Sequence, residues 1–148
     1  LKEEINFMLN YMAIQKFRFA GAMHLQCEIE PEAEISMVPA MCVLTFVENA
    51  IKYNRNDGSV SVFLTQTAQE IQIVVKDTGV GIPKEDQDRV FERFYRVDKS
   101  HSKEIGGTGL GLSIVKHAVG ALKGSVILRS EEGNGTEICM KFPKVHKE

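Results

Sequence analysis

A run of glycines late in the chain has the residue types of a phosphate-binding loop. It spans Gly106-Gly107-Thr108-Gly109-Leu110-Gly111-Leu112, and a helical pattern that ends near Lys123 follows it. Glycine lets the backbone come close to a ligand, and the first N–H groups of a helix attract anions. The run therefore indicates a phosphate-binding loop, and a flexible glycine hinge is the alternative.

The run matches neither of two common phosphate-binding motifs. A P-loop requires lysine and then serine or threonine after its last glycine, whereas Leu112 occupies the position of that lysine. A dinucleotide-binding fingerprint requires G-x-G-x-x-G directly after a strand. Gly107, Gly109 and Gly111 instead form G-x-G-x-G after a polar stretch. Both motifs are excluded.

A second candidate group lies on a helix predicted at 40–53. Asn49 is followed by Lys52 and Tyr53 at i+3 and i+4, so the three side chains share one face. An amide oxygen suits Mg²⁺, which usually keeps water and substrate phosphates as its other ligands. Lys52, one turn later, can reach such phosphates. A solvated helix end is the alternative.

A third candidate is Asp77, which ends a predicted strand and begins a glycine loop. The loop reads Asp77-Thr78-Gly79-Val80-Gly81-Ile82-Pro83. A carboxylate there can accept a hydrogen bond from an exocyclic amine, which would select adenine over guanine. An ordinary Asp-x-Gly turn is the alternative.

The composition is that of a single globular domain. The chain has 148 residues, of which 43% are hydrophobic and 26% charged, and its formal net charge is −2. It lacks a basic surplus, so we expect no nucleic-acid partner. No apolar run approaches the ~20 residues that span a bilayer, so we expect no membrane contact. Cys27, Cys42 and Cys139 are far apart and odd in number, and we expect reduced thiols in a cytosolic protein.

The apolar periodicity predicts about three long helices and five strands. The helices are expected at 1–19, at 40–53 with Pro39 in the first turn, and from the glycine run to 123; the strands at 23–30, 59–67, 70–77, 125–130 and 136–142. The charged stretch 84–103 should form a short helix and then a mobile segment. This order predicts an α/β (α+β) two-layer sandwich, with the helices on one face of a mixed five-stranded sheet.

Taken together, the motifs resemble a known family. The order F-V-E-N-A-I-K-Y (46–53), D-T-G-V-G-I (77–82), F-E-R-F-Y-R (91–96) and G-G-T-G-L-G-L (106–112) closely resembles the N, G1, F and G2 boxes of sensor histidine kinases. Their catalytic ATP-binding domain has the Bergerat (GHKL) fold, shared with type II topoisomerases, a heat-shock chaperone and mismatch-repair ATPases. The resemblance covers about 23–143. The N-terminal third, with 10–19, the following strand and V-E-N-A-I-K (47–52), looks LytS-like, whereas the lid and G2 region (95–112) looks PhoR-like.

The resemblance implies a role for each matching residue. Asn49 would coordinate the Mg²⁺ that bridges the ATP phosphates, with Lys52 and Tyr53 at phosphate and nucleoside. Asp77 would accept from the adenine amine. The other residues implied at the ATP site are Gly79, Gly81 and Ile82 beside the base, Thr136 behind Asp77, and Gly107, Thr108, Gly109, Leu110, Gly111 and Leu112 around the triphosphate.

The resemblance also implies an ATP lid at 95–104. It would include Tyr95 and the cations Arg96, Lys99 and Lys103, for which plain solvation is the alternative. Phe91 and Phe94 would anchor the lid or dock the helix that presents the substrate histidine. Ordinary core packing is the alternative for one of the two.

One departure from related ATPases bears on the chemistry. Thr45 stands where hydrolytic Bergerat ATPases have a glutamate base, four residues before Asn49. Threonine cannot act as a general base near neutral pH, which favours phosphate transfer to a side chain over water activation. Glu48 is the nearest carboxylate and a candidate for activating the acceptor. A surface pair with Lys52 is the alternative.

The acceptor is a second departure. None of His24, His101, His117 and His146 lies in a phosphoacceptor-like sequence. We therefore expect no autophosphorylation by this chain alone. Residues 1–20 should be a helix that links to a missing upstream dimerisation and phosphoacceptor module, and 21–148 the catalytic ATP-binding domain.

The resemblance implies a protein-histidine kinase domain that transfers the γ-phosphoryl of ATP in two-component signalling. Its partners would be the helical phosphoacceptor domain of the same parent and, indirectly, a response regulator. The domain would be a cytoplasmic monomer, in a parent that can be membrane-bound. A Bergerat-type ATPase that drives conformational change and a non-catalytic nucleotide-binding module are the alternatives.

Overall fold

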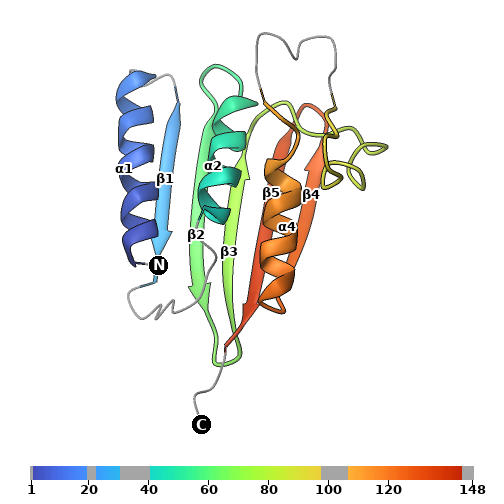
Figure 1. The fold of residues 1–148 in the computed structure, drawn as a ribbon. Helices are drawn as coiled ribbons and strands as arrows, with labels where there is room; N and C mark the ends of the chain where they lie inside the picture. The colour runs from blue at the N-terminus through green and yellow to red at the C-terminus, as the bar shows by residue number, and fades with distance from the viewer. Residues whose placement is uncertain (1, 20–22, 31–40, 98–106, 145–148) are drawn as a thin grey trace.

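The computed structural model describes residues 2–19, 23–30, 41–97 and 107–144 (Figure 1). This part of the chain contains, in order, α1 (Lys2–Arg18), β1 (His24–Ile29), α2 (Cys42–Lys52), β2 (Ser59–Gln66), β3 (Glu70–Asp77), α4 (Gly111–Ala121), β4 (Ser125–Glu131) and β5 (Gly135–Pro143). The three predicted long helices and the five strands are therefore confirmed, apart from the boundaries given below.

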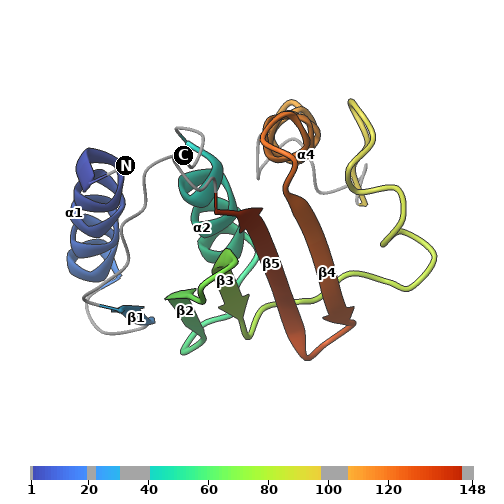
Figure 2. The same cartoon turned by 90° about the horizontal axis from the view of Figure 1, so that it is seen from below.

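The strands form one mixed sheet in the order β1-β2-β3-β5-β4. β1 is parallel to β2, and the other neighbouring pairs are antiparallel. Figure 2, which looks along the strands, shows α1, α2 and α4 on the same side of the sheet. The structure confirms the predicted two-layer sandwich with its helices on one face.

The core lies between this face and the helices. Alternate residues of the central strands are buried: Val60, Val62 and Leu64 in β2, Ile71, Ile73 and Val75 in β3, and Ile138, Met140 and Phe142 in β5. The register aligns these rows, because Leu64 lies opposite Ile73, and Ile73 opposite Met140. A shift by one residue would turn a whole row to solvent, so the apolar pattern specifies the register.

Each helix contributes apolar side chains to the same core. The buried ones include Phe46 and Val47 of α2, Val115 and Val119 of α4, and Met8 and Met12 of α1. α1 packs against β1 at the edge of the sheet (Figure 1). None of the helices in the described ranges is long and apolar enough to cross a membrane.

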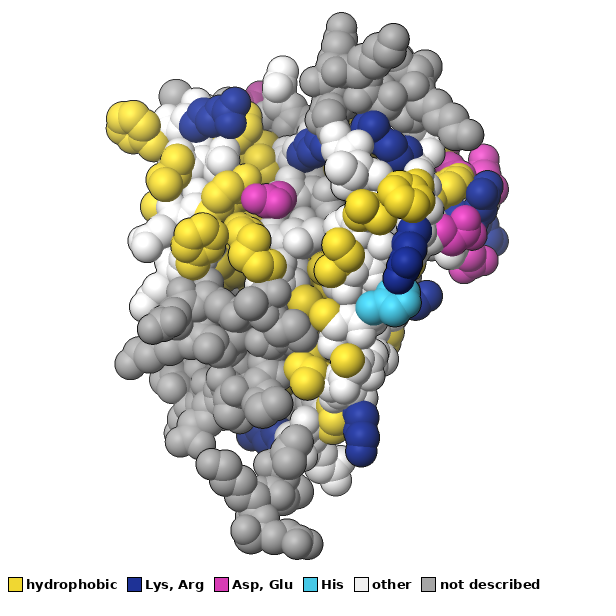
Figure 3. All heavy atoms as spheres, viewed as in Figure 1, with side chains coloured by type: hydrophobic (Ala, Val, Ile, Leu, Met, Phe, Trp, Pro, Cys, Tyr) yellow, Lys and Arg dark blue, Asp and Glu magenta, His cyan; other side chains and the backbone are white. Residues whose placement is uncertain are grey.

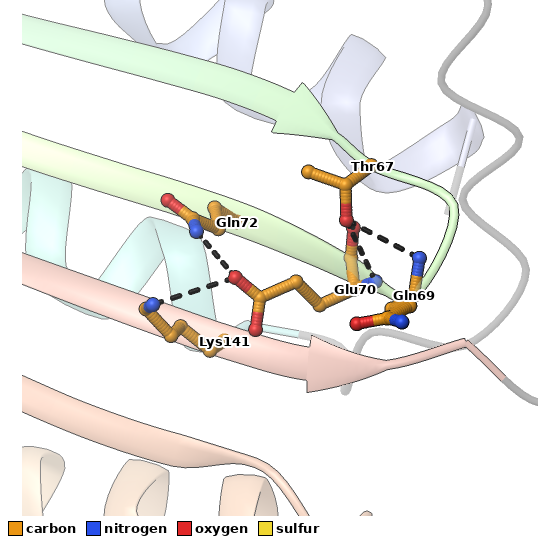
Figure 4. A network of polar contacts seen from close by, with 5 residues as sticks. All are labelled: Thr67, Gln69, Glu70, Gln72 and Lys141. Atoms are coloured by element: carbon orange, nitrogen blue, oxygen red, sulfur yellow. Dashed lines mark hydrogen bonds and ion pairs between the residues drawn. The ribbon is translucent and has the colours of Figure 1, made fainter.

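The turn between β2 and β3 closes the lower end of the sheet in Figure 1, and a polar network holds it (Figure 4). The Thr67 hydroxyl accepts hydrogen bonds from the N–H groups of Gln69 and Glu70, at 3.2 and 3.1 Å. The Glu70 carboxylate accepts from Gln72 and pairs with Lys141 of β5 at 3.4 Å. These contacts, with the Gln72 hydrogen bond first, lower the pKa of Glu70. The loops with candidate chemistry lie at the opposite end.

The predicted start of the second helix is wrong. α2 begins at Cys42, and Met41 before it has a left-handed backbone with φ of 70°. The Met41 carbonyl accepts from both the N–H and the hydroxyl of Thr45, each at 2.9 Å, and so receives the first bonds of the helix. Pro39 and Ala40, in the predicted first turn, lie outside the described residues.

The short helix predicted after Pro83 is also wrong. Residues 84–91 form consecutive turns, in which the N–H groups of Asp86 and Arg89 bond to carbonyls three residues earlier. Val90 is buried and Phe91 half-buried, whereas most of their neighbours are charged and exposed. So few apolar contacts do not hold a regular helix against the core. The sequence also predicts a mobile segment after this helix, within 84–103, and residues 98–103 lie outside the described residues.

Two substitutions on α4 test the assigned core face. Val119 is fully buried, whereas Ile114 on the same helix is 62% exposed. Val119→Ala should lower the free energy of unfolding by about 1–3 kcal/mol, because two buried carbons are lost and a cavity remains. Ile114→Ala should change it by about 0.5 kcal/mol or less. Urea unfolding measures both, and equal losses would contradict the assigned orientation of α4.

Candidate functional site

The candidate residues gather at one end of the molecule, the upper end in Figure 1. The C-terminal end of α2, the loop after β3, the turn between β4 and β5 and the start of α4 all meet there. Figure 3 shows Lys and Arg side chains near the C-terminal end of α2. Segments far apart in the sequence thus form one surface at this end.

α2 is the shared wall of this surface, because both glycine segments lie against it. A Cβ on Gly79 would come within 2.4 Å of the Tyr53 carbonyl oxygen. A Cβ on Gly111 would meet the Thr45 methyl at 3.1 Å, and one on Gly107 would lie 2.9 Å from Lys52 Nζ. The loop after Asp77 therefore approaches the C-terminal end of α2, whereas the glycine run lies along the same helix from Lys52 to Thr45.

The structure brings Asn49, Lys52 and Tyr53 together on α2, as the spacing predicts. Asn49 is half-buried, and its side-chain amide makes no hydrogen bond within the described ranges. Lys52 Nζ lies 5.2 Å from the centroid of the Tyr53 ring, and both side chains are exposed. A half-buried amide without a partner, next to an exposed cation, is available to a ligand.

Asp77 stands at the end of β3 with one carboxylate oxygen engaged. Oδ1 accepts from the N–H of Gly79 at 2.8 Å and from the N–H of Thr136 at 3.2 Å. Burial raises the pKa of Asp77, and these two hydrogen bonds partly offset the rise. Oδ2 accepts no hydrogen bond from any described residue, so one oxygen is held and the other is available.

Two side chains that the sequence motifs do not include support this carboxylate. The Ser130 hydroxyl donates to the Gly135 carbonyl at 2.9 Å and accepts from the Ile82 N–H at 2.8 Å. It also lies 2.9 Å from the Thr136 hydroxyl. Ser130 has a single proton to donate, so Thr136 is the donor of this pair. Gln87 Nε2 donates to the carbonyls of Ile82 and Ser130, each at 2.9 Å. Ile82 and Thr136 are therefore fixed through Ser130 and Gln87.

One backbone hydrogen bond joins the residues on either side of the predicted lid, 95–104. The Phe94 N–H donates to the Gly109 carbonyl at 2.9 Å. A Cβ on Gly109, whose φ is 71°, would lie 2.8 Å from the Phe94 backbone, so a larger residue would open this contact. Phe94 is 71% exposed, whereas Phe91 is half-buried against the core. Of the two phenylalanines proposed as lid anchors, Phe91 is the one that packs against the core.

The Tyr95 side chain contacts residues that precede it in the chain. Its hydroxyl donates to the Asp86 carboxylate, and the Arg89 guanidinium lies 4.2 Å from its ring centroid. This arrangement places Tyr95 against the turn segment at the start of the lid. Lys99 and Lys103 of the predicted lid, and Gly106, lie outside the described residues.

Glu48 is exposed, and its charge acts on α1. Burial raises the pKa of Tyr11 in α1, and the Glu48 carboxylate raises it further. The Glu48 carboxylate is thus close enough to α1 to act on Tyr11, and as the residue before Asn49 it lies about 100° around α2 from that side chain.

The start of α4 presents free backbone donors. Its N-cap residue, Leu110, makes no side-chain capping bond, and the first residues of the helix are Gly111 and Leu112. The Leu110 carbonyl accepts from Ile114 N–H and from the Ser113 hydroxyl. The first N–H groups of a helix have no partner within that helix, so with Thr108 and Gly109 before them they line an anion-binding end.

Comparison with known proteins gives one family and several relatives. Residues 38–146 match the family described as "Histidine kinase-, DNA gyrase B-, and HSP90-like ATPase". The chain is 46% identical over 102 residues to the sensor-like histidine kinase SenX3 of Mycolicibacterium smegmatis, which is 69% of this chain and 27% of that protein. It is 46% identical over 99 residues to the sensor histidine kinase WalK of Bacillus subtilis, which is 66% of this chain and 16% of that protein. The chain spans about a quarter or less of these relatives.

Solved structures have the same fold. The mycobacterial sensor histidine kinase MprB superposes with a TM-score of 0.78 and 29% identity, and the match covers 96% of this chain and 94% of that chain. The catalytic domain of the histidine kinase ThkA also gives a TM-score of 0.78, with 21% identity over 97% of this chain and 94% of that chain.

Replacing Asp77 should reveal the cost of its buried charge. A raised pKa in the folded state means that this group stabilises the fold below the ordinary aspartate pKa of about 4, and that the contribution is lost as pH rises through the raised value. Asp77→Asn removes the charge but keeps an oxygen for Gly79 and Thr136. The melting temperature of the ligand-free domain should therefore rise at pH 7, by roughly 2–4 °C for each kcal/mol relieved.

The gain should shrink as the pH falls toward 4, which thermal melts at a series of pH values would follow. Glu137→Gln is the control, because Glu137 lies on β5 beside Thr136 and pairs with the exposed Arg129. A melting temperature for Asp77→Asn at or below wild type at every pH would contradict the assignment.

Proposed function

The chain belongs to the family of histidine kinase-, DNA gyrase B- and HSP90-like ATPases, and on this premise we propose a specific activity. It is the ATP-binding catalytic domain of a sensor histidine kinase, and it transfers the γ-phosphoryl of ATP to a histidine on a separate helical domain. The relatives support this proposal, since they are sensor histidine kinases. The rest of such a protein, beyond the matched 27% of SenX3 or 16% of WalK, would carry the acceptor.

One observation carries the proposal: α2 contacts both glycine segments. Gly79 lies against Tyr53 at the C-terminal end of the helix, and Gly111 against Thr45, about two turns nearer the N-terminus. Lys52 lies beside Gly107. A nucleotide laid across α2 would therefore have its base at the Asp77 loop and its phosphates at the glycine run.

The base end is built to select adenine. Asp77 Oδ2 is available to accept a hydrogen bond from the 6-amino group of adenine, whereas guanine presents a carbonyl oxygen there. Gly79 lets the loop after Asp77 lie close to the C-terminal end of α2, because a Cβ at this position would collide with the Tyr53 carbonyl oxygen. Gly81 has φ of 70°, and a Cβ there would lie 2.1 Å from the Glu131 carbonyl oxygen, so glycine lets the loop pack against the end of β4.

The phosphate end fits Mg²⁺ bound to a nucleotide. The described residues contain no cluster of three His, Cys, Asp or Glu side chains that would hold a metal ion by themselves. Asn49 supplies one amide oxygen without another partner, which suits an ion whose remaining ligands are water and phosphate oxygens. Bound there, Mg²⁺ would offset the negative charge of the phosphates. Lys52 and the first N–H groups of α4 would bind the phosphates directly.

The environment of Thr45 favours transfer to a side chain. Its hydroxyl donates to the Met41 carbonyl inside the helix, and its methyl group faces Gly111. This position therefore offers no base to activate water. Glu48, exposed on the side toward α1, is our candidate for activating the acceptor imidazole.

We place this domain in the cytoplasm, where ATP and the response regulator would be available. Its direct partner is the phosphoacceptor helical domain of the same parent protein, and the regulator receives the phosphate from that domain. The isolated domain is a monomer in this proposal. The N-terminal α1 leads toward the acceptor module.

Phosphate transfer tests the proposal directly. The full-length parent incubated with ATP labelled in the γ-phosphate and Mg²⁺ should acquire label that is lost in acid and kept in base, as phosphohistidine is. This chain alone should bind Mg·ATP without becoming labelled. Acid-stable label would contradict the proposal, and steady hydrolysis by the isolated chain would favour a conformational ATPase. A chain whose melting temperature does not respond to Mg·ATP would be a non-catalytic module.

Asn49→Ala should weaken nucleotide binding only in the presence of Mg²⁺. We expect a loss of about tenfold in affinity for Mg·ATP, which is about 1.4 kcal/mol, and little change for ATP in excess EDTA. Isothermal titration calorimetry gives both values. Asn56→Ala, at an exposed turn position, is the control. An equal loss with and without Mg²⁺ would remove Asn49 from the metal site.

A further inference from the structure

Arg55 binds three backbone carbonyls around the Asp77 loop, although no sequence motif includes it. It lies in the turn after α2, two residues beyond Tyr53. Nε donates to the Thr78 carbonyl at 2.5 Å. Nη2 donates to the Gly79 carbonyl at 3.3 Å and to the Gly133 carbonyl at 2.6 Å. No carboxylate among the described residues forms an ion pair with this guanidinium.

These contacts join two segments that border the base end. Thr78 and Gly79 directly follow Asp77, and Gly133 lies in the turn between β4 and β5. The Gly133 N–H also donates to the Val80 carbonyl at 2.7 Å. The turn is thus fastened to the loop by one backbone bond and by the Arg55 side chain.

Both backbone polar groups of Gly79, its N–H and its carbonyl, are bonded to side chains. Its N–H bonds to Asp77 Oδ1 at 2.8 Å, and its carbonyl accepts from Arg55. The orientation of the Asp77 carboxylate is therefore fixed through Gly79, because Arg55 in turn holds the Gly79 carbonyl. Hydrogen bonds with a charged donor are about twice as strong as neutral ones, so Arg55 is a strong constraint on this loop.

We propose that Arg55 is a positioning residue for adenine recognition. By holding the Thr78 and Gly79 carbonyls against the β4–β5 turn, it fixes the loop that orients Asp77 toward the base. The inference rests on the proposed nucleotide site, but the residue and its role are additional to it. Arg55 touches only backbone carbonyls of the protein, so it acts on adenine through Asp77.

Lysine should replace Arg55 only in part. The guanidinium is a planar fork whose donors reach several carbonyls at once, whereas an ammonium is a point charge on a flexible stem. Arg55→Lys keeps the charge and can bond fewer carbonyls. Arg55→Met keeps the apolar stem and removes every donor. The pair separates the effect of charge from the effect of geometry.

The test is the ratio of the affinities for ATP and GTP, measured by calorimetry with Mg²⁺. Both nucleotides carry the same triphosphate, so a general weakening of the domain cancels in the ratio. We expect wild type to prefer ATP. The ratio of the ATP affinity to the GTP affinity should fall about tenfold in Arg55→Met and about threefold in Arg55→Lys. Arg129→Met, which removes an arginine that is 76% exposed on β4, should behave as wild type.

An unchanged ATP-to-GTP ratio in Arg55→Met would overturn the inference and leave the nucleotide site standing. Wild type that binds neither nucleotide would overturn the proposed function itself. Melting temperatures without nucleotide show whether each variant is folded. If Arg55→Met does not fold, Arg55→Lys carries the same comparison, and a wild-type ratio in that folded variant would then overturn the inference.

Discussion

The tie between Asp77 and two backbone N–H groups is the interaction on which the rest of the site depends. One carboxylate oxygen holds Gly79, just after β3, and Thr136, at the start of β5. Burial makes the ionised form unfavourable, as the raised pKa shows, and the two N–H donors offset part of that cost. A carboxylate buried only for a structural reason would lower the free energy of unfolding without a compensating gain. With one oxygen bonded and one available, it makes sense as a pre-oriented acceptor.

The sheet makes this tie possible. β3 and β5 are neighbours, and their register places Lys76 opposite Glu137, so Asp77 reaches the level of Thr136. Gly135 lies where a Cβ would approach the Asp77 carbonyl to 2.1 Å, so only glycine lets the strands come this close. α2 crosses the same end and touches both glycine segments. The geometry of the site is therefore set by strand pairing and one helix, and the loops only complete it.

The sequence predicts the fold well where the pattern that specifies an element lies within that element. Alternation in 59–67 and 70–77 locates β2 and β3, and the glycine run locates the start of α4. Arg55, Ser130 and Gln87 escape prediction because they bind backbone carbonyls and N–H groups whose identity is the same in every residue. Their partners also lie far away, 78 residues from Arg55 in the case of Gly133. The turns after Pro83 are missed for another reason: charged residues there suit an exposed helix as well as turns, and packing decides between them.

The two ends of the site are held very differently. At the base end, the side chains of Arg55, Ser130 and Gln87 restrain the loop after Asp77 through hydrogen bonds, and the Thr136 N–H holds the Asp77 carboxylate. At the phosphate end, α4 has no side-chain cap, and the Asn49 amide has no partner among the described residues. A base is recognised by hydrogen bonds of fixed direction, and these require an acceptor that is held rigidly before binding. A triphosphate is recognised largely by charge, and its own oxygens can satisfy donors that the protein leaves open. In the proposed nucleotide site, the protein thus restrains the base end before binding, whereas the ligand would complete the hydrogen bonds at the phosphate end.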